Sequence, residues 1–344
     1  MSTHRAFPES VALARMAGSY GAFPKPLALA RMAGSCSGLL LLVLAGCVRG
    51  ETKPEATGPV LLGRIECAQI TEASGIARSG LRGDRFWVIN DGGSPPVLHA
   101  IGVDGRDHGT LRVASASNVD WEALASFDLD GRSWLLAADT GDNNAIRDHS
   151  TLYVVEEPRL EIGEAATSTP AWTLTFRWPD GPRDCEAVAV DAAAGRILLL
   201  SKRTVPAVLY ELPLRPETAG VLTAIRLCEV DGLPQPTPRD LERAAPERNW
   251  HWQPTAMDIR ADGGAAAILT YRAVYHFERT GGEPWIAAFR KPATIVALGD
   301  LREAESVAFA GDGKSVIVTV EAEAAPIYRV SLSPRAGEGR EYEK

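Results

Sequence analysis

One short pattern occurs five times along this chain, and it limits the possible folds more than any other feature. The second position of each copy is a short polar or acidic residue, the third is small, the fourth is a large aliphatic residue and the fifth is mostly alanine. The unequal spacing of the copies excludes a tight solenoid and favours modules joined by loops of variable length. The five copies are ASGIARS (73–79), WEALASF (121–127), CEAVAVD (185–191), PTAMDIR (254–260) and AESVAFA (304–310).

The segments that follow each copy also repeat. A turn with Asp-Gly or another glycine-containing pair comes first, which is typical of a connection between adjacent antiparallel strands. A strongly apolar strand, a third strand and, in most units, a fourth strand follow. Four strands with an apolar inner strand and short hairpins are typical of a β-propeller blade. The sequence therefore predicts an all-β fold, a β-propeller with five four-stranded blades.

The two ends of the predicted propeller complement each other. The fifth unit lacks a fourth strand, whereas residues 58–66 (GPVLLGRIE) form a strand that has no unit of its own. We expect this N-terminal strand to complete the last blade, because closure removes exposed strand edges. Six blades are the alternative, since residues 227–254 could contain a degenerate module. The prolines and charges of that segment favour a long loop or lid.

The N-terminal segment is not expected to be part of the fold. Residues 38–46 (GLLLLVLAG) form an apolar run of signal-peptide length, which is short for a transmembrane helix. The run ends in Leu44-Ala45-Gly46-Cys47, which resembles the lipobox of bacterial lipoproteins. That resemblance implies that Cys47 becomes the lipidated first residue of the mature protein. An ordinary signal peptide with a chance cysteine is the alternative.

These features predict the organisation and location of the chain. Val48 follows the cysteine in place of an aspartate, so the expected location is the cell envelope, lipid-anchored to the outer membrane and facing the periplasm or the exterior. The formal net charge of −8 and the lack of a basic stripe argue against a nucleic-acid partner. The predicted parts are a leader (1–47), a tether (48–57), a propeller domain (58–332) and a charged tail (333–344).

The repeat also predicts where polar side chains meet. The start of each inner strand and the end of the next strand lie on the same face of a propeller, because the two strands are antiparallel neighbours. Two rings of side chains should therefore surround one mouth of the central channel. The first ring is Ser74, Glu122, Glu186, Thr255 and Glu305, and the second is Asp91, Asp139, Lys202, Tyr271 and Glu321.

The density of carboxylates at this mouth suggests a cation. Like charges that are held together raise one another's pKa or recruit a metal ion. Ca²⁺ accepts many oxygen ligands in loose geometry, so it is the predicted cofactor. In the sharpest form of this hypothesis Glu122, Glu186 and Glu305 share one ion. The alternative is that the carboxylates bond to backbone amides and hold neighbouring blades together. The predicted metal ligands are Glu122, Glu186, Glu305, Asp120, Asp139 and Asp142.

A loop after the second unit is equally rich in oxygen donors. The sequence DTGDNNAIRDHS (139–150) contains Asp139 and Asp142, together with Arg147, whose guanidinium can pair with a carboxylate or a phosphate. The alternative is a turn held by hydrogen bonds from Asx side chains. The sequence also allows one disulfide among three cysteines of the mature chain, which are Cys67, Cys185 and Cys228.

Several of these segments resemble a known family. NVDWEALA, TGDNNAIR, DCEAVAV and ESVAFAGDGKSVIVTVE look like the uncharacterised bacterial exported β-propellers that carry DWE and GDN…R motifs, over about residues 72–332. More distantly, the chain is similar to the propeller families called esterase-like activity of phytase and to the β-propeller phytases. This second resemblance implies Ca²⁺ and phosphoester chemistry.

Two hypotheses for the function follow. In the first, a lipid-anchored propeller binds a small molecule or an envelope partner at its acidic mouth, and the metal is structural. In the second, the protein is a metal-dependent hydrolase of phosphoesters or esters. Glu122 or Glu186 would be its general base, and Lys202 or Arg147 would stabilise developing charge. No Gly-x-Ser-x-Gly elbow occurs, so an α/β-hydrolase triad is not supported.

Overall fold

The computed structural model describes residues 58–217, 219–244, 250–301 and 303–333. These residues belong to one compact unit. The predicted leader with Cys47, the tether and the charged tail from residue 334 onward lie outside the described residues. Among the residues that are described, no helix has the length and apolar character needed to span a membrane.

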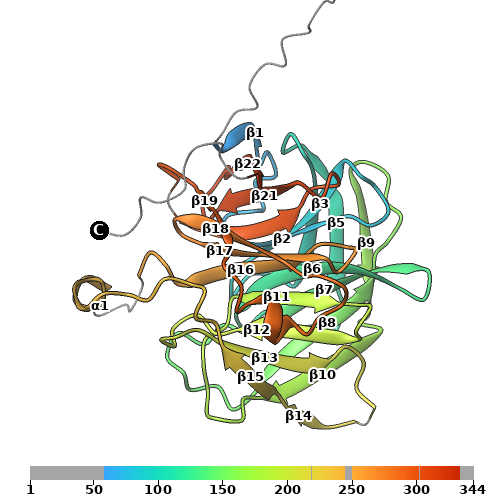
Figure 1. The fold of residues 1–344 in the computed structure, drawn as a ribbon. Helices are drawn as coiled ribbons and strands as arrows, with labels where there is room; N and C mark the ends of the chain where they lie inside the picture. The colour runs from blue at the N-terminus through green and yellow to red at the C-terminus, as the bar shows by residue number, and fades with distance from the viewer. Residues whose placement is uncertain (1–57, 218, 245–249, 302, 334–344) are drawn as a thin grey trace, which may run out of the picture. The chain divides into compact units, whose positions relative to one another are not determined.

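Five sheets form the five blades of a β-propeller, as the repeat predicts (Figure 1). The innermost strands coincide with the five repeated copies. They are β2 (Ala73–Arg78), β6 (Trp121–Leu129), β11 (Ala187–Asp191), β16 (Pro254–Ile259) and β20 (Ala304–Phe309). The second strands are β3 (Arg85–Asn90), β7 (Arg132–Asp139), β12 (Arg196–Leu200), β17 (Ala265–Thr270) and β21 (Ser315–Val320).

The outer half of each blade is also regular. The third strands are β4 (Val97–Gly102), β8 (Ser150–Glu156), β13 (Val208–Pro213), β18 (Ala273–Glu278) and β22 (Pro326–Ser331). The strands in fourth position are β5 (Asp107–Val113), β10 (Trp172–Arg177), β15 (Ile225–Glu229), β19 (Thr294–Ala297) and β1 (Val60–Arg64). Within the described ranges there are five sheets, so the six-bladed alternative is wrong.

The ring closes in two ways. Along the channel, β2 contacts both β6 and β20, and β11 contacts both β6 and β16, while β16 also contacts β20. At the periphery, β1 pairs antiparallel with β22 from Val60 opposite Arg329 to Arg64 opposite Pro326. The N-terminal strand therefore completes the fifth blade, and this prediction is confirmed.

Two strands were not predicted from the sequence. β9 (Glu164–Ser168) lies between β8 and β10 in the chain but pairs parallel with β5 of the preceding blade. β14 (Val221–Thr223) lies between β13 and β15 and pairs parallel with β10 of the preceding blade. Each of these strands ties the outer edge of one blade to the next.

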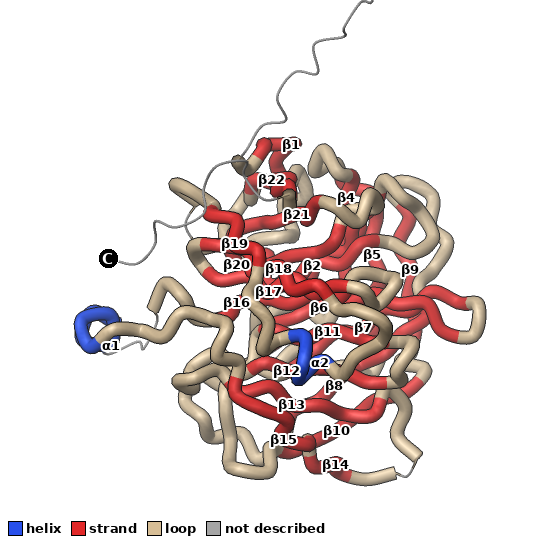
Figure 2. Tube along the Cα trace, in the orientation of Figure 1, coloured by secondary structure: helices blue, strands red, loops and turns tan. Residues whose placement is uncertain are grey.

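The segment considered as a sixth module is largely irregular. Its described part contains α1 (Pro238–Ala244), and residues 245–249 lie outside the description. A second helix, α2 (Trp285–Ala288), follows β18, and its Trp285 ring stacks on Phe289. Figure 2 shows these short helices against a structure that otherwise consists of strands and loops.

Small residues allow the inner strands to approach one another closely. Ala187 and Ala189 of β11 are completely buried. A Cβ at Gly75 of β2 would lie 2.7 Å from the backbone nitrogen of Leu124 in β6, which is too close for any side chain. The alanines and glycine of the repeat are therefore a packing requirement of the crowded channel. The three cysteines that could have formed a disulfide, Cys67, Cys185 and Cys228, are all free and buried.

Candidate cation site at the channel mouth

The first predicted ring lies at the starts of the inner strands, and all its members are buried. The two hydroxyl members link neighbouring blades. Ser74 Oγ donates a hydrogen bond to Glu122 Oε2 at 2.9 Å, and Thr255 Oγ1 donates one to the carbonyl of Ala304 at 2.7 Å. Glu122 thus receives one donor from the adjacent blade, and its other oxygen remains available.

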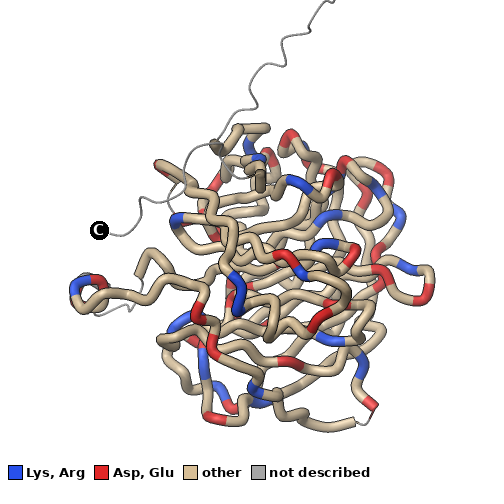
Figure 3. Tube along the Cα trace, viewed as in Figure 1, with Lys and Arg blue, Asp and Glu red and all other residues tan. Residues whose placement is uncertain are grey.

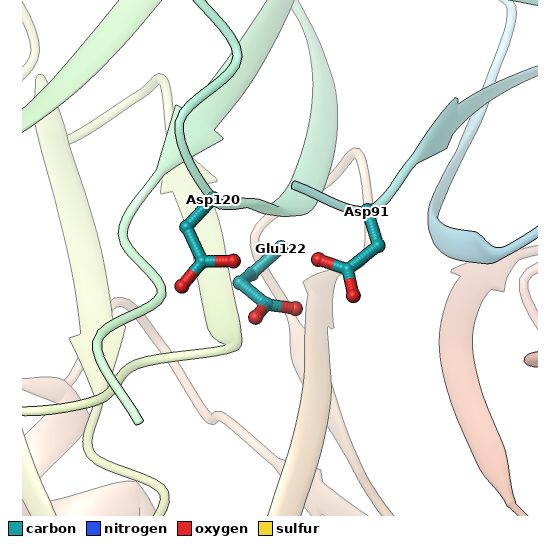
Figure 4. Close-up of side chains that lie close together, drawn as sticks. All are labelled: Asp91, Asp120 and Glu122. Atoms are coloured by element: carbon teal, nitrogen blue, oxygen red, sulfur yellow. The ribbon is translucent and has the colours of Figure 1, made fainter. Parts of the chain in front are cut away.

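Three carboxylates from two adjacent blades, with Glu122 among them, lie close together. Asp91 follows β3, Asp120 precedes β6 and Glu122 lies on β6. One oxygen of each lies within 4.8 Å of the others, and the three side chains converge as Figure 4 shows. Asp91 and Asp120 are half-buried, so this set, which we call the outer group, is accessible to solvent.

Two glycines make room around the outer group. A Cβ at Gly141 would overlap with Asp120 Oδ2 and lie 2.6 Å from Glu122 Oε1. A Cβ at Gly92 would lie 2.6 Å from Asp120 Oδ1. The backbone can approach these oxygens only because both positions lack a side chain. Glycine at positions 92 and 141 is therefore needed for these carboxylates to lie close to the backbone and to one another.

Two carboxyls of the outer group, Asp120 and Glu122, have raised pKa values. Burial, together with the charges of Asp91 and Asp184, raises the pKa of Asp120 to about 6. Burial raises the pKa of Glu122 well above its ordinary value, and the carboxylates of Glu186 and Asp91 add to that effect. No member of the outer group forms a salt bridge within the described residues. A bound cation would relieve this repulsion.

Glu122 also belongs to a second set of carboxylates, which we call the inner group. It comprises Glu122, Asp184 and Glu186, all three buried, with oxygens again within 4.8 Å of one another. Asp184 accepts a hydrogen bond from the backbone nitrogen of Asp142 at 3.0 Å and one from Arg203 Nε at 2.7 Å. The inner group is therefore partly neutralised by the protein itself.

Lys202 supplies most of that neutralisation. Its side chain is 4% exposed and forms an ion pair with Glu186 Oε1. Burial alone would lower the pKa of Lys202, but Glu186 and Glu305 outweigh it and hold that pKa well above its ordinary value. Its Nζ also lies 5.6 Å from the centre of the Tyr271 ring. Lys202 thus remains charged at the centre of the mouth.

Glu305 has a different environment from Glu122 and Glu186. Burial raises its pKa to about 7, and the charge of Lys202 acts against that increase. Glu305 lies outside both the outer and the inner group. Of the three glutamates predicted to share one ion, the structure brings Glu122 and Glu186 together and places Glu305 within the field of Lys202.

The loop after β7 holds its own carboxylates. Asp139 accepts hydrogen bonds from the backbone nitrogen of Asp120 at 3.0 Å and from Arg147 Nη2 at 2.8 Å. Asp142 accepts bonds at 2.9 Å from the backbone nitrogens of Ile146 and Arg147. Arg147 Nη1 also donates to the carbonyl of Gly141 at 2.6 Å. Asp139, Asp142 and Arg147 are therefore engaged in holding the loop in place.

Asp91 and Asp184 also belong to the oxygen-rich set that the sequence places at this mouth, although they are not among the six predicted metal ligands, and the structure brings Asp91 into the outer group and Asp184 into the inner group. Asp184 lies two residues before a ring position, as do Asp120, Glu72 and Glu303. The backbone carbonyls of three of these acids accept a hydrogen bond from a backbone nitrogen at the end of the second strand of the same blade. The donors and acceptors are Asp91 and Glu72, Lys202 and Asp184, and Glu321 and Glu303. This recurring spacing is the sequence signal that associates Asp184 with Glu186, as it associates Asp120 with Glu122. Figure 3 shows how acidic and basic residues intermingle along the described chain.

No family model matches the chain, and no curated protein matches it. Among solved structures it is similar to a nidogen/laminin complex, with 11% identity, a TM-score of 0.37, and coverage of 75% of this chain and 80% of that chain. It is also similar to a luciferin-regenerating enzyme, with 12% identity, a TM-score of 0.43, and coverage of 80% of this chain and 95% of that chain.

Proposed function

We propose that this protein is a ligand-binding β-propeller whose acidic mouth holds a divalent cation, with Ca²⁺ as the best match. The outer group carries the proposal. Oxygens that bind one Ca²⁺ at about 2.3–2.6 Å lie no more than about 5 Å apart. The separations within 4.8 Å among Asp91, Asp120 and Glu122 are compatible with that geometry. The donor set, which consists only of carboxylates, matches a hard cation.

The partial exposure of Asp91 and Asp120 supports a binding role beyond a structural ion. Three carboxylates leave several positions of a Ca²⁺ ion to other oxygen ligands. A ligand that carries carboxylate, phosphate or hydroxyl oxygens would take those positions. The ion would thus connect the propeller to a small molecule or to an envelope partner.

Calcium titrated into the metal-free protein should bind, and Glu122→Gln should weaken that binding at least about tenfold, which corresponds to about 1.4 kcal/mol. The reason is that Glu122 is the buried ligand of the outer group. Isothermal titration calorimetry measures the affinity. The matched control is Glu66→Gln, which removes an exposed carboxylate elsewhere and should leave the affinity unchanged. Equal affinities in all three proteins would refute the proposed site.

A metal-dependent phosphoester or ester hydrolase is the second candidate function. It is favoured by the access of solvent to the outer group, because a catalytic metal must keep a position open for water or substrate. The structure provides less support for the predicted charge-stabilising groups. Lys202 is bound to Glu186, and Arg147 is bound to Asp139. A screen of phosphoester and ester substrates with and without Ca²⁺ separates the candidates, since a binding protein would release no product in either condition.

We further propose that the propeller is lipid-anchored in the cell envelope through Cys47, at the outer membrane and facing the periplasm or the exterior. The support is the tetrad Leu44-Ala45-Gly46-Cys47 after the apolar run. Cys47→Ser should abolish acylation and move the protein from the membrane to the soluble fraction. Metabolic labelling with a fatty acid and membrane fractionation measure both effects. Persistence of label and membrane association in the variant would show that the lipobox interpretation is wrong.

A further inference from the structure

One buried carboxylate oxygen at the mouth lacks a hydrogen-bond partner. Glu186 Oε1 is paired with Lys202, but Glu186 Oε2 has no partner among the described residues, although the side chain is only 6% exposed. A buried, unsatisfied carboxylate oxygen is costly, so such an atom indicates a ligand that completes its contacts. The Glu186 carboxylate belongs to the inner group, whose oxygens lie within 4.8 Å of one another.

The inner and outer groups share Glu122. A carboxylate has two oxygens and can therefore bridge two ions, as in sites where two metals lie about 3.5–4 Å apart. Glu122 Oε2 accepts one hydrogen bond from Ser74, which leaves it a further lone pair, and Oε1 lies on the side of Gly141. The position of Glu122 is thus suited to joining two cations.

The balance of charge at the mouth also favours bound cations. The two groups and Glu305 contribute six carboxylates, and the bonded cations are Lys202 and Arg203. Carboxylates therefore outnumber the cations that the protein itself supplies to the two groups.

We infer that the mouth binds two divalent cations bridged by Glu122. One is held by the outer group, and the second lies deeper, between Glu122, Asp184 and the unpaired oxygen of Glu186. This inference rests on the proposed function, because it extends the outer site into a pair. Lys202 neutralises Glu186 Oε1 and leaves Oε2 to the inner ion, so the lysine limits the inner position to one cation.

The number of bound ions tests this inference. Equilibrium dialysis of the metal-free full chain against Ca²⁺ should give two ions per chain. Asp91→Asn removes a ligand of the outer group only, and Glu186→Gln removes one of the inner group only, so each variant should retain one ion. Asp184→Asn is a second inner variant, and it should behave like Glu186→Gln. Glu122→Gln should weaken the binding of both ions.

The outcomes separate this inference from the proposed function. One ion in the native chain, lost in Asp91→Asn and retained unchanged in Glu186→Gln and Asp184→Asn, would overturn the second site and leave the first intact. Absence of bound Ca²⁺ in the native chain would overturn both. Far-UV circular dichroism of each variant verifies that the strands are intact, and Glu66→Gln serves as the control that should keep two ions.

Discussion

Replacement of Lys202 by methionine should lower the free energy of unfolding by about 3–5 kcal/mol at pH 7, the range typical of removing one partner from a buried ion pair. The side chains of Lys202 and Glu186 are 4% and 6% exposed, so solvent screens this pair very little. The substitution leaves two buried carboxylates, Glu186 and Glu305, without their nearest positive charge. Urea unfolding at equilibrium measures the loss.

The loss should depend on pH in a defined direction. Burial already raises the pKa of Glu186 and Glu305, and removal of Lys202 raises both further. Carboxyls whose folded pKa exceeds the unfolded one bind more protons in the folded state, so the stability of the variant falls as pH rises through those values. The difference from the native protein should therefore be smaller at pH 5 than at pH 8. Lys314→Met, an exposed lysine, is the control. Equal effects of the two substitutions would contradict the account.

Deletion of residues 60–64 should destabilise the entire propeller and not merely shorten one end. β1 pairs with β22 over four residue pairs and covers the outer edge of the fifth blade. At about 1 kcal/mol for each net hydrogen bond, removal of this ladder should cost about 3 kcal/mol or more, before any exposed apolar surface is counted. It also shifts the chain that leads to Ile65 and Ile70, which pack in the core between the first and fifth blades.

Deletion of residues 51–55 from the same protein is the control, since it removes an equal length of chain that precedes the strand. Urea unfolding should show one transition for both proteins, at a lower midpoint for the deletion of 60–64. Identical midpoints would mean that the fifth blade is stable without its N-terminal strand.

The fold could be predicted because the sequence repeats its own structural unit. Turns such as Asp130-Gly131 and the apolar strands around them recur in each blade, and this regularity gives the order and direction of the strands. The antiparallel geometry then places Glu122, Glu186 and Glu305 at one mouth. β9 and β14 could not be predicted, because they are short and largely exposed and carry no alternating apolar pattern.

The details of the site were less accessible to sequence reasoning. The direction of a long side chain decides that Lys202 neutralises Glu186 and that Glu305 lies outside both carboxylate groups. A sequence repeat indicates where the strands lie, but it does not indicate in which direction a long side chain points. Asp91 joins Asp120 and Glu122 in the outer group because adjacent blades are in contact, and only the closed ring specifies that contact. Membrane anchoring at Cys47 and the resemblance to the DWE and GDN…R family remain predictions.

The most direct test of the central claim, a cation bound at the channel mouth, is the melting temperature of the protein after chelation and again with added Ca²⁺. An ion that binds only the folded state at 100 times its dissociation constant adds about 2.7 kcal/mol of stability. For a domain of this size the melting temperature should then rise by about 5 °C, and Glu122→Gln should reduce that rise. An unchanged melting temperature of the native protein would contradict the account. Hydrogen bonding of the carboxylates to neighbouring blades would then be their role.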